Sequence, residues 1–206
     1  MKRWLAVSCA LLATACVSHP KPEYFATLAV PSSIPGSFLA LQEVEAVYGE
    51  GKIKFQAALQ KQGDVITLLG FTPFGTRAFL LQQRGAEVTF TSYVDRELPF
   101  PPRYVLIDIH RAYFWAPLPG PEENPPGDGW LELSRDGEVV RERWEGGTLR
   151  QRTFEREAGE PAGLIDIVYE PGMKDGVPPD AVIFHNGWFG YTLFIRTRSY
   201  QPIQPR

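Results

Sequence analysis

Short segments in which apolar and polar residues alternate, separated by glycine-containing turns, constrain the fold of this chain more than any other feature. The clearest segment places four apolar side chains at alternate positions: Ile53, Phe55, Ala57 and Leu59. A period of two puts such side chains on one face of a β-strand. Turn-forming residues at 62–64 and 84–85 divide this segment from those that follow. Residues 38–93 are therefore predicted to form a meander of four or five antiparallel strands.

One helix is predicted in the middle of the chain, over Pro102–Trp115. The proline that opens it suits a first helical turn, where a missing N–H costs little, and apolar residues recur at helical spacing behind it. Asp108 and Arg111 are three residues apart and are expected to pair on its exposed side. Six more strand-like segments follow the helix: residues 130–133, 139–144, 149–154, 164–169, 181–185 and 191–196. The fold class predicted is mainly β (α+β), with about eleven strands.

The first sixteen residues have the pattern of a secretory signal. Basic residues at positions 2–3 precede a compact apolar run, Trp4–Leu12, which is too short to span a bilayer and fits the apolar region of a signal peptide. Small residues at 13–15 then lead directly into Cys16. That order resembles the lipobox of bacterial lipoproteins, which implies removal of residues 1–15 and lipidation of Cys16. The alternative is an ordinary signal peptide that is cut nearby.

The mature chain is expected to begin with a tether and to continue into one β domain. Residues 16–37 contain four prolines and no regular apolar period, so they are predicted to be the lipidated tether, and residues 38–206 the domain. Val17 follows Cys16, and by resemblance to enterobacterial sorting rules a residue other than aspartate favours the outer membrane. Acyl chains such as palmitate are then expected to hold the protein on the periplasmic face of that membrane.

The charge balance argues against nucleic acid as a partner. The formal net charge is −3, and removal of the two basic residues of the signal peptide makes it about −5. Such a chain lacks the basic excess that binds phosphate backbones. An aromatic content of 13%, with 19 glycines and 19 prolines, is typical of a β-rich chain with many turns.

Four stretches of the chain together resemble a family of bacterial lipoproteins. They are Leu69–Phe79 (LGFTPFGTRAF), 129–140 (GWLELSRDGEVV), 164–171 (LIDIVYEP) and 186–199 (NGWFGYTLFIRTRS). Over residues 38–198 the chain is similar to the DUF3261 family, which is LolA/LolB-like. The resemblance implies a half-open barrel of about eleven antiparallel strands, curved around a hydrophobic concavity that holds acyl chains, with a helical lid.

A curved sheet of this size cannot bury its inner face under one short helix unless the chain closes further or a ligand fills the space. Large apolar side chains on the alternating faces are therefore candidates for lining a ligand cavity, together with two from the lid: Phe55, Phe79, Phe90, Trp144, Phe184 and Phe194, with Tyr113 and Trp115. For any one of them a place in a dry core is the simpler interpretation.

Phe71 and Phe74 lie on either side of Pro73, which cannot donate to a sheet ladder, so this segment is expected to be a loop between two strands. Poorly covered rings in such a loop can insert in a membrane or dock on a partner. A protruding apolar loop has that role in LolB-like proteins. The alternative is that both rings fold back onto the core.

No catalytic, metal or cofactor site is predicted. The chain has no G-x-S-x-G motif, and its three histidines lack metal-ligand spacing. Five arginines on two consecutive segments, interleaved with glutamates, are expected to form cross-strand ion pairs on an exposed face: Arg141, Arg143, Arg150, Arg152 and Arg156. The alternative is that one of them points inward and binds a lipid head group or a carboxylate.

These observations predict a monomeric, non-catalytic outer-membrane lipoprotein that binds or transfers an acylated lipid or a lipoprotein in a hydrophobic barrel. The alternative is an accessory envelope lipoprotein that has a filled core and docks on another protein. An apolar cavity on the inner face favours the first interpretation, and dense packing there favours the second.

Overall fold

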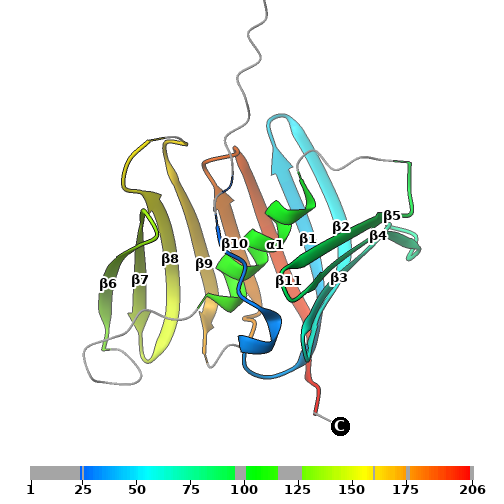
Figure 1. The fold of residues 1–206 in the computed structure, drawn as a ribbon, viewed down its shortest axis with the longest axis horizontal. Coiled ribbons are helices and arrows are strands. Elements are labelled where there is room, and N and C mark those ends of the chain that lie inside the picture. The colour runs from blue at the N-terminus through cyan, green and yellow to red at the C-terminus, as the bar shows by residue number, and fades with distance from the viewer. Residues whose placement is uncertain are drawn as a thin grey trace, which may run out of the picture.

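Over the residues that the structure describes, the fold consists of eleven antiparallel strands, one α-helix and two short helical turns, the first of which is η1 (Pro31–Ser33) (Figure 1). The structure, a computed structural model, describes residue 24 and residues 26–95, 101–115, 127–159, 161–174 and 177–204. The strands are β1 (Phe38–Tyr48), β2 (Gly51–Gln62), β3 (Val65–Phe71), β4 (Arg77–Arg84), β5 (Glu87–Ser92), β6 (Gly129–Arg135), β7 (Glu138–Glu145), β8 (Thr148–Arg156), β9 (Leu164–Met173), β10 (Ala181–Asn186) and β11 (Tyr191–Pro202).

Two meanders are joined into one sheet by the pairing of the first strand with the last. The order across the sheet is β5-β4-β3-β2-β1-β11-β10-β9-β8-β7-β6. Consecutive strands within each meander are neighbours, as short turns require. The long-range pair β1–β11 runs from Phe38 opposite Pro202 to Tyr48 opposite Tyr191. Four or five strands were expected before the helix and six after it, and the structure has five and six.

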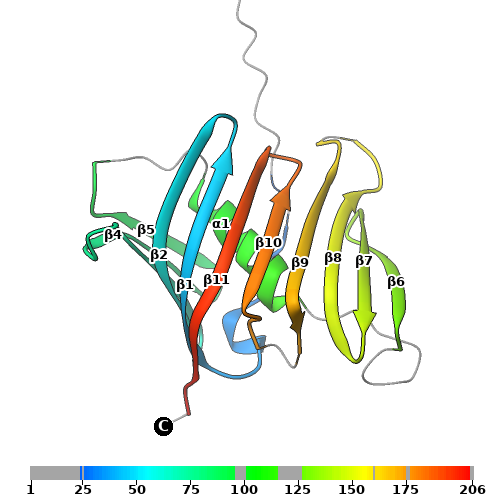
Figure 2. The same cartoon turned by 180° about the vertical axis from the view of Figure 1, so that it is seen from behind.

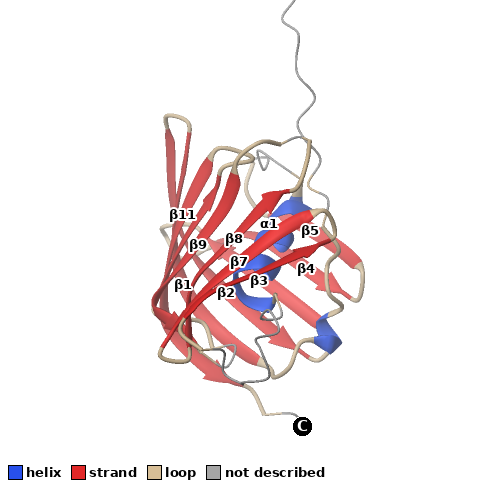
Figure 3. Ribbon diagram, turned by 90° about the vertical axis from the view of Figure 1, so that its left-hand side faces the viewer, coloured by secondary structure: helices blue, strands red, loops and turns tan. Residues whose placement is uncertain are grey.

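The helix lies across the concave face of the sheet. Helix α1 (Pro102–Ile109) continues into a wider turn, η2 (His110–Phe114), so together they fill the predicted helical segment. Figure 1 shows α1 in front of the middle strands, and Figure 2 shows the convex face without a helix over it. From the side, the sheet curls so that α1 lies between the middle strands and β4–β5 (Figure 3). This arrangement confirms the predicted mainly β fold with a curved, open sheet and a helix over it.

The core lies between the helix and the sheet. Alternate residues of the middle strands point inward and are buried, among them Ile165 and Ile167 on β9 and Phe184 on β10. The N-terminal segment also contributes, since Tyr24 and Ile34 are buried on the same side as α1. In the part of the chain that the structure describes, no helix is long and apolar enough to cross a membrane.

Candidate functional site

The helix divides the concave face into two parts of different character. Eight consecutive helical residues, Leu106 to Tyr113, are buried where the helix packs on the sheet. We call β7–β11 under this helix the closed half. On the other side of α1, the inward side chains of β2, β4 and β5 near the β3–β4 turn are only half-buried. We call β2–β5 the open half.

Two buried ion pairs fasten the helix to the closed half. Arg152 and Glu142 are completely buried, and Nη2 of the arginine lies 2.7 Å from Oε1 of the glutamate. Arg152 also donates to the carbonyl oxygens of Arg111 (2.9 Å) and Trp115 (3.3 Å), so it caps the end of the helix. Arg111 in turn donates to Oε1 of Glu138 at 2.9 Å. Because breaking such a buried pair costs about 3–5 kcal/mol, this half is a structural core.

Aromatic rings surround the buried guanidinium of Arg111. Its central carbon lies 4.2 Å from the ring centroid of Phe154 and 5.1 Å from that of Trp188. Its Nε and Nη1 atoms have no hydrogen-bond partner among the described residues. The negative faces of these rings stabilise the cation in place of further acceptors.

The carboxylate of Asp108 ties the helix to three other segments. It accepts hydrogen bonds from the hydroxyl of Tyr24 at 2.6 Å, from the hydroxyl of Tyr191, and from the side-chain amide of Asn186 at 3.4 Å. Burial raises the pKa of Asp108 to about 6, although these donors and Arg111 act in the opposite direction. The expected pairing of Asp108 and Arg111 on the exposed side is wrong. Both are buried, because this face of the helix packs on the sheet, where each has its own partners.

Three phenylalanines cross the open half. Phe55 on β2, Phe79 on β4 and Phe90 on β5 all point to the concave face and are half-buried. The ring centroids of Phe55 and Phe79 are 5.9 Å apart, and those of Phe79 and Phe90 are 6.2 Å apart. We call these three residues the phenylalanine strip. It is an apolar surface on the inner side of the sheet that the helix does not bury completely.

Gly70 makes this arrangement possible. It lies on β3 opposite Phe79, and the ring of Phe79 lies over it. A Cβ atom at position 70 would be 2.2 Å from Cε1 of that ring, far inside van der Waals contact. A glycine inside a strand therefore allows the ring to bridge from β4 towards Phe55 on β2.

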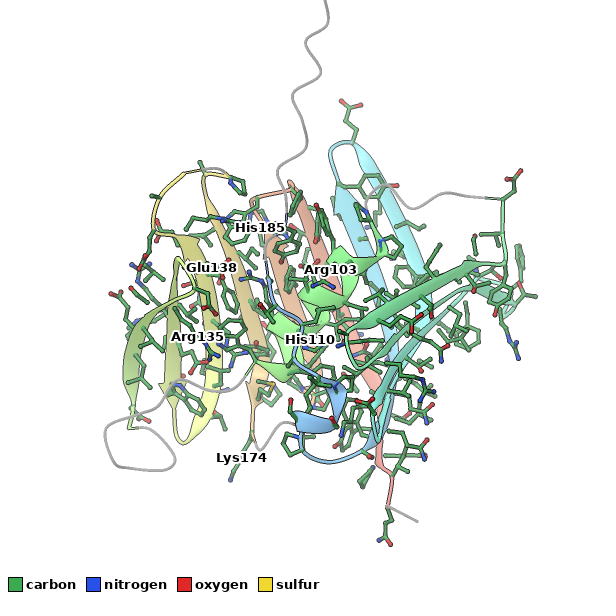
Figure 4. All side chains as sticks on the ribbon, viewed as in Figure 1. Arg103, His110, Arg135, Glu138, Lys174 and His185 are labelled. Carbon is green, nitrogen blue, oxygen red and sulfur yellow. The ribbon has the colours of Figure 1, made fainter. Side chains whose placement is uncertain are left out.

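Arg103 and His110 lie on the side of α1 that faces β5 (Figure 4). Nε2 of His110 is 2.7 Å from Oε1 of Gln83, and burial lowers the pKa of this histidine to about 4, with a smaller effect from Arg103. Arg103 is exposed, and its Nη2 makes one long bond of 3.4 Å to the carbonyl oxygen of Ala26. No ion pair joins it to an acid in the part of the chain described here.

The structure separates the residues predicted to line a cavity. The phenylalanine strip lies on the open half. Three of the other candidates are buried in the closed half: Tyr113, Trp144 and Phe184. Trp115 is half-buried, with its ring 5.0 Å from that of Phe154. These four therefore belong to the packed core under the helix.

Phe194 lies on the opposite face from the one predicted. It is 45% exposed and points to the convex side. Strand pairing gives the reason: the inward Phe184 is opposite Leu193, so Leu193 shares the inner face and the next residue points outward. A shift of one residue in the alternation of this strand produced the wrong assignment.

The turn between β3 and β4 presents an exposed aromatic ring. Phe74 is 93% exposed, whereas Phe71 ends β3 and is half-buried on the convex side. The turn is closed by a bond from the backbone N–H of Thr72 to the carbonyl oxygen of Thr76, at 2.8 Å. The two rings therefore do not both fold back onto the core.

The arginines of β7 and β8 divide between the two faces. Arg141 is on the convex face and bonds to Glu132 (2.6 Å) and Glu155 (2.8 Å), as expected for exposed cross-strand pairs. Arg152 points inward, which contradicts its expected place on the exposed face. Its carboxylate partner is Glu142 of the same protein, because Arg152 and Glu142 are neighbours in the β7–β8 register.

Sequence reasoning missed four residues that shape this face: Tyr24, Gly70, Arg103 and Glu142. Gly70 carried a usable signal, because an isolated glycine within an apolar strand indicates close approach of another group. Tyr24 and Arg103 carried none, since their partners are distant in the sequence, whereas Glu142 lies only ten residues before Arg152, on the adjacent strand. Among the described residues, no group of three or more histidine, cysteine, aspartate or glutamate side chains could hold a metal ion. Cys16 lies outside the described residues.

Comparison with known proteins gives matches of two kinds. A LolA superfamily protein from Nitrosomonas europaea has a TM-score of 0.44 and 11% identity, covering 83% of this chain and 88% of that one. A domain from Vibrio parahaemolyticus described as an outer membrane lipoprotein-sorting protein has a TM-score of 0.39 and 10% identity, covering 81% and 85%. No curated protein matches the chain in sequence. The model of a family described as "Protein of unknown function (DUF3261)" matches residues 39–199, and the chain belongs to that family.

Proposed function

We propose that this protein binds an acylated molecule, a lipid or a lipoprotein, against the phenylalanine strip of the open half and transfers it without breaking a bond. The observation that carries this proposal is the incomplete burial of Phe55, Phe79 and Phe90 on a concave, inward-facing surface. Aromatic side chains on such a surface are normally covered, and a partly uncovered apolar surface favours an apolar ligand.

The open half differs from the packed core of the closed half in how completely its aromatic rings are buried. In the closed half, Phe154 and Phe184 are completely or almost completely buried, and the buried side chains of Arg152 and Glu142 pair with each other. In the open half no ion pair or hydrogen bond of the described residues crosses the phenylalanine strip. An acyl chain can therefore lie along the strip without displacing a structural interaction.

The proposal places the protein at the outer membrane, held by lipid on Cys16 after removal of residues 1–15. Phe74 supplies a second candidate contact, because its exposed ring extends from a turn with no covering element. A bilayer surface or a membrane-bound partner fits a lone apolar ring of this kind. The alternative function, an accessory lipoprotein that docks on another envelope protein, would use Phe74 but would not need the phenylalanine strip.

The test compares aspartate substitutions at four phenylalanines in the unlipidated Cys16→Ser protein. Phe79→Asp and Phe90→Asp should fold but lose at least about tenfold in affinity for an acyl probe, equivalent to about 1.4 kcal/mol. Phe194→Asp, on the convex face, should leave binding unchanged. Phe154→Asp should unfold, since an unpaired charge in a dry core costs several kcal/mol.

Thermal unfolding and displacement of the neutral fluorescent probe N-phenyl-1-naphthylamine by acyl compounds measure the two effects separately. Folded Cys16→Ser protein that binds no acyl compound would favour the accessory function. Equal loss of binding in Phe79→Asp and Phe194→Asp would also contradict a site on the concave face.

A further inference from the structure

We propose that the acylated molecule carries an acidic head group, a carboxylate or a phosphate, and that Arg103 binds it. This inference rests on the proposed function, because it names the class of ligand that the phenylalanine strip accepts. Its basis is the position of an exposed guanidinium on the helix that borders the strip, on the side that faces β5 (Figure 4).

Arg103 is exposed and not held in a buried ion pair, unlike Arg111 and Arg152. Arg111 and Arg152 are buried, and they form ion pairs with Glu138 and Glu142, respectively. Arg103 has only the 3.4 Å bond to the Ala26 carbonyl oxygen, and no acid of the described residues forms an ion pair with it. Its fork of donors is therefore available to a ligand.

Among the described residues, no acid forms an ion pair with Arg103, and its neighbours on this side of the helix are uncharged. His110, on the same side of the helix, is neutral at physiological pH because its pKa is lowered to about 4. Gln83, which bonds to this histidine, is also neutral. Phe90 and Val88 present apolar inward side chains on β5, the strand that α1 contacts. A cation beside an apolar strip matches a molecule with an anionic end and an acyl chain.

The chemistry of the guanidinium specifies the class of head group. Its planar donors bind carboxylate and phosphate oxygens in pairs, and such charge-assisted bonds are stronger than those to neutral esters or hydroxyls. Because Arg103 is exposed, solvent weakens the attraction, and an ion pair in that setting contributes up to about 1 kcal/mol. We therefore expect a preference of about fivefold for an acid over its neutral ester.

The experiment measures displacement of neutral N-phenyl-1-naphthylamine from the Cys16→Ser protein by matched pairs of acyl compounds. Palmitate is compared with methyl palmitate, and lysophosphatidic acid with the corresponding monoacylglycerol. The parent protein should bind the acidic member of at least one pair about fivefold more tightly, and the pair that shows the preference distinguishes a carboxylate from a phosphate. Arg103→Gln should remove the preference by weakening binding of the acid, with the neutral member unchanged.

Two further variants control for charge and position. Arg103→Lys should keep part of the preference, and Arg196→Gln, which removes an exposed arginine from the convex face, should keep all of it. Equal affinity for acids and neutral compounds in the parent protein, or an undiminished preference in Arg103→Gln, would overturn the inference while leaving the proposed function intact. Failure of the parent protein to bind any acyl compound would instead remove the proposed function.

Discussion

Two titratable residues that are two positions apart in the helical segment, Asp108 and His110, have pKa values shifted by burial in opposite directions. The pKa of Asp108 rises from 3.8 to about 6, and that of His110 falls from 6.5 to about 4. The raised aspartate stabilises the fold fully below pH 3.8, and this contribution is lost as the pH rises through 6. The lowered histidine stabilises the fold above pH 6.5, and this contribution is lost as the pH falls through 4. The two effects oppose each other between pH 4 and 6.5.

Removing either group should therefore expose the pH dependence of the other. In Asp108→Asn, the free energy of unfolding relative to the parent protein should rise between pH 4 and 6.5, and in His110→Gln it should fall. A shift of about two pKa units corresponds to about 3 kcal/mol in each case. Urea denaturation across this range measures the difference, and subtraction of the parent curve cancels the other carboxylates. Parallel curves for the two variants would show that these pKa shifts are absent.

The N-terminal segment acts as an element of the domain over the residues that the structure describes. Tyr24 packs edge to face on Tyr104 of α1, with the ring centroids 5.4 Å apart, and bonds to Asp108. Further along, the buried ammonium of Lys61 donates to the carbonyl oxygens of Ile34 (2.6 Å) and Gly36 (2.5 Å). The segment therefore fastens the helix at one end and β2 at the other.

Loss of the Tyr24 hydroxyl should weaken this attachment in a pH-dependent way. Tyr24→Phe removes a donor from the buried carboxylate of Asp108, which should cost about 1–3 kcal/mol at pH 7.5. The cost should shrink at pH 5, where Asp108 is largely protonated and needs its donors less. Tyr104→Phe is the control, because among the described residues its hydroxyl makes a single bond, accepted from the Tyr24 backbone N–H at 3.3 Å. Chemical denaturation at both pH values measures the loss in free energy of unfolding for each variant. An equal loss in the two variants would contradict the argument.

At this scale the sequence predicts elements well and partners poorly. The period of two and the glycine turns predicted about eleven strands, four or five before the helix and six after it, because each hairpin depends on residues close together in the chain. The inward direction of Arg152 could not be predicted, because it depends on which face of the whole sheet receives the helix. The prediction for Phe194 was wrong for a different reason: Arg196 and Arg198 share its face of β11, and this alternation already indicated that Phe194 points outward.

At the scale of the molecule, the helix and its ion pairs close one half of the concave face and leave the other available. A sheet whose first and last strands pair in the middle has β5 and β6 as its two edge strands. The sheet curls so that β4 and β5, the strands that carry Phe79 and Phe90, lie across from the middle strands with α1 between them (Figure 3). The position of the Phe79 ring in the open half therefore depends on the glycine at position 70, which leaves room for the ring.

The position of Tyr24 also limits how far the domain can lie from the membrane. Cys16 is eight residues before it, and an extended chain of that length reaches at most about 29 Å. If Cys16 carries the lipid, the N-terminal segment and the helix to which it is tied stay within that distance of the bilayer. The β3–β4 turn with Phe74 extends from the open half of the same domain.

Membrane attachment should therefore have one strong and one weak component. Cys16→Ser should leave the protein as an unprocessed precursor or a soluble species, because acyl chains, at about 0.8 kcal/mol for each buried CH₂, exceed what a single exposed ring provides. Any residual membrane fraction of the processed protein should fall further in Cys16→Ser/Phe74→Ser, while Cys16→Ser/Phe194→Ser, altered on the convex face, should match the single variant. Fractionation with immunodetection of each protein measures both components. Complete recovery of Cys16→Ser with the outer membrane would show that lipid on this cysteine is not the anchor, and an unchanged residual fraction without Phe74 would place the weak contact elsewhere.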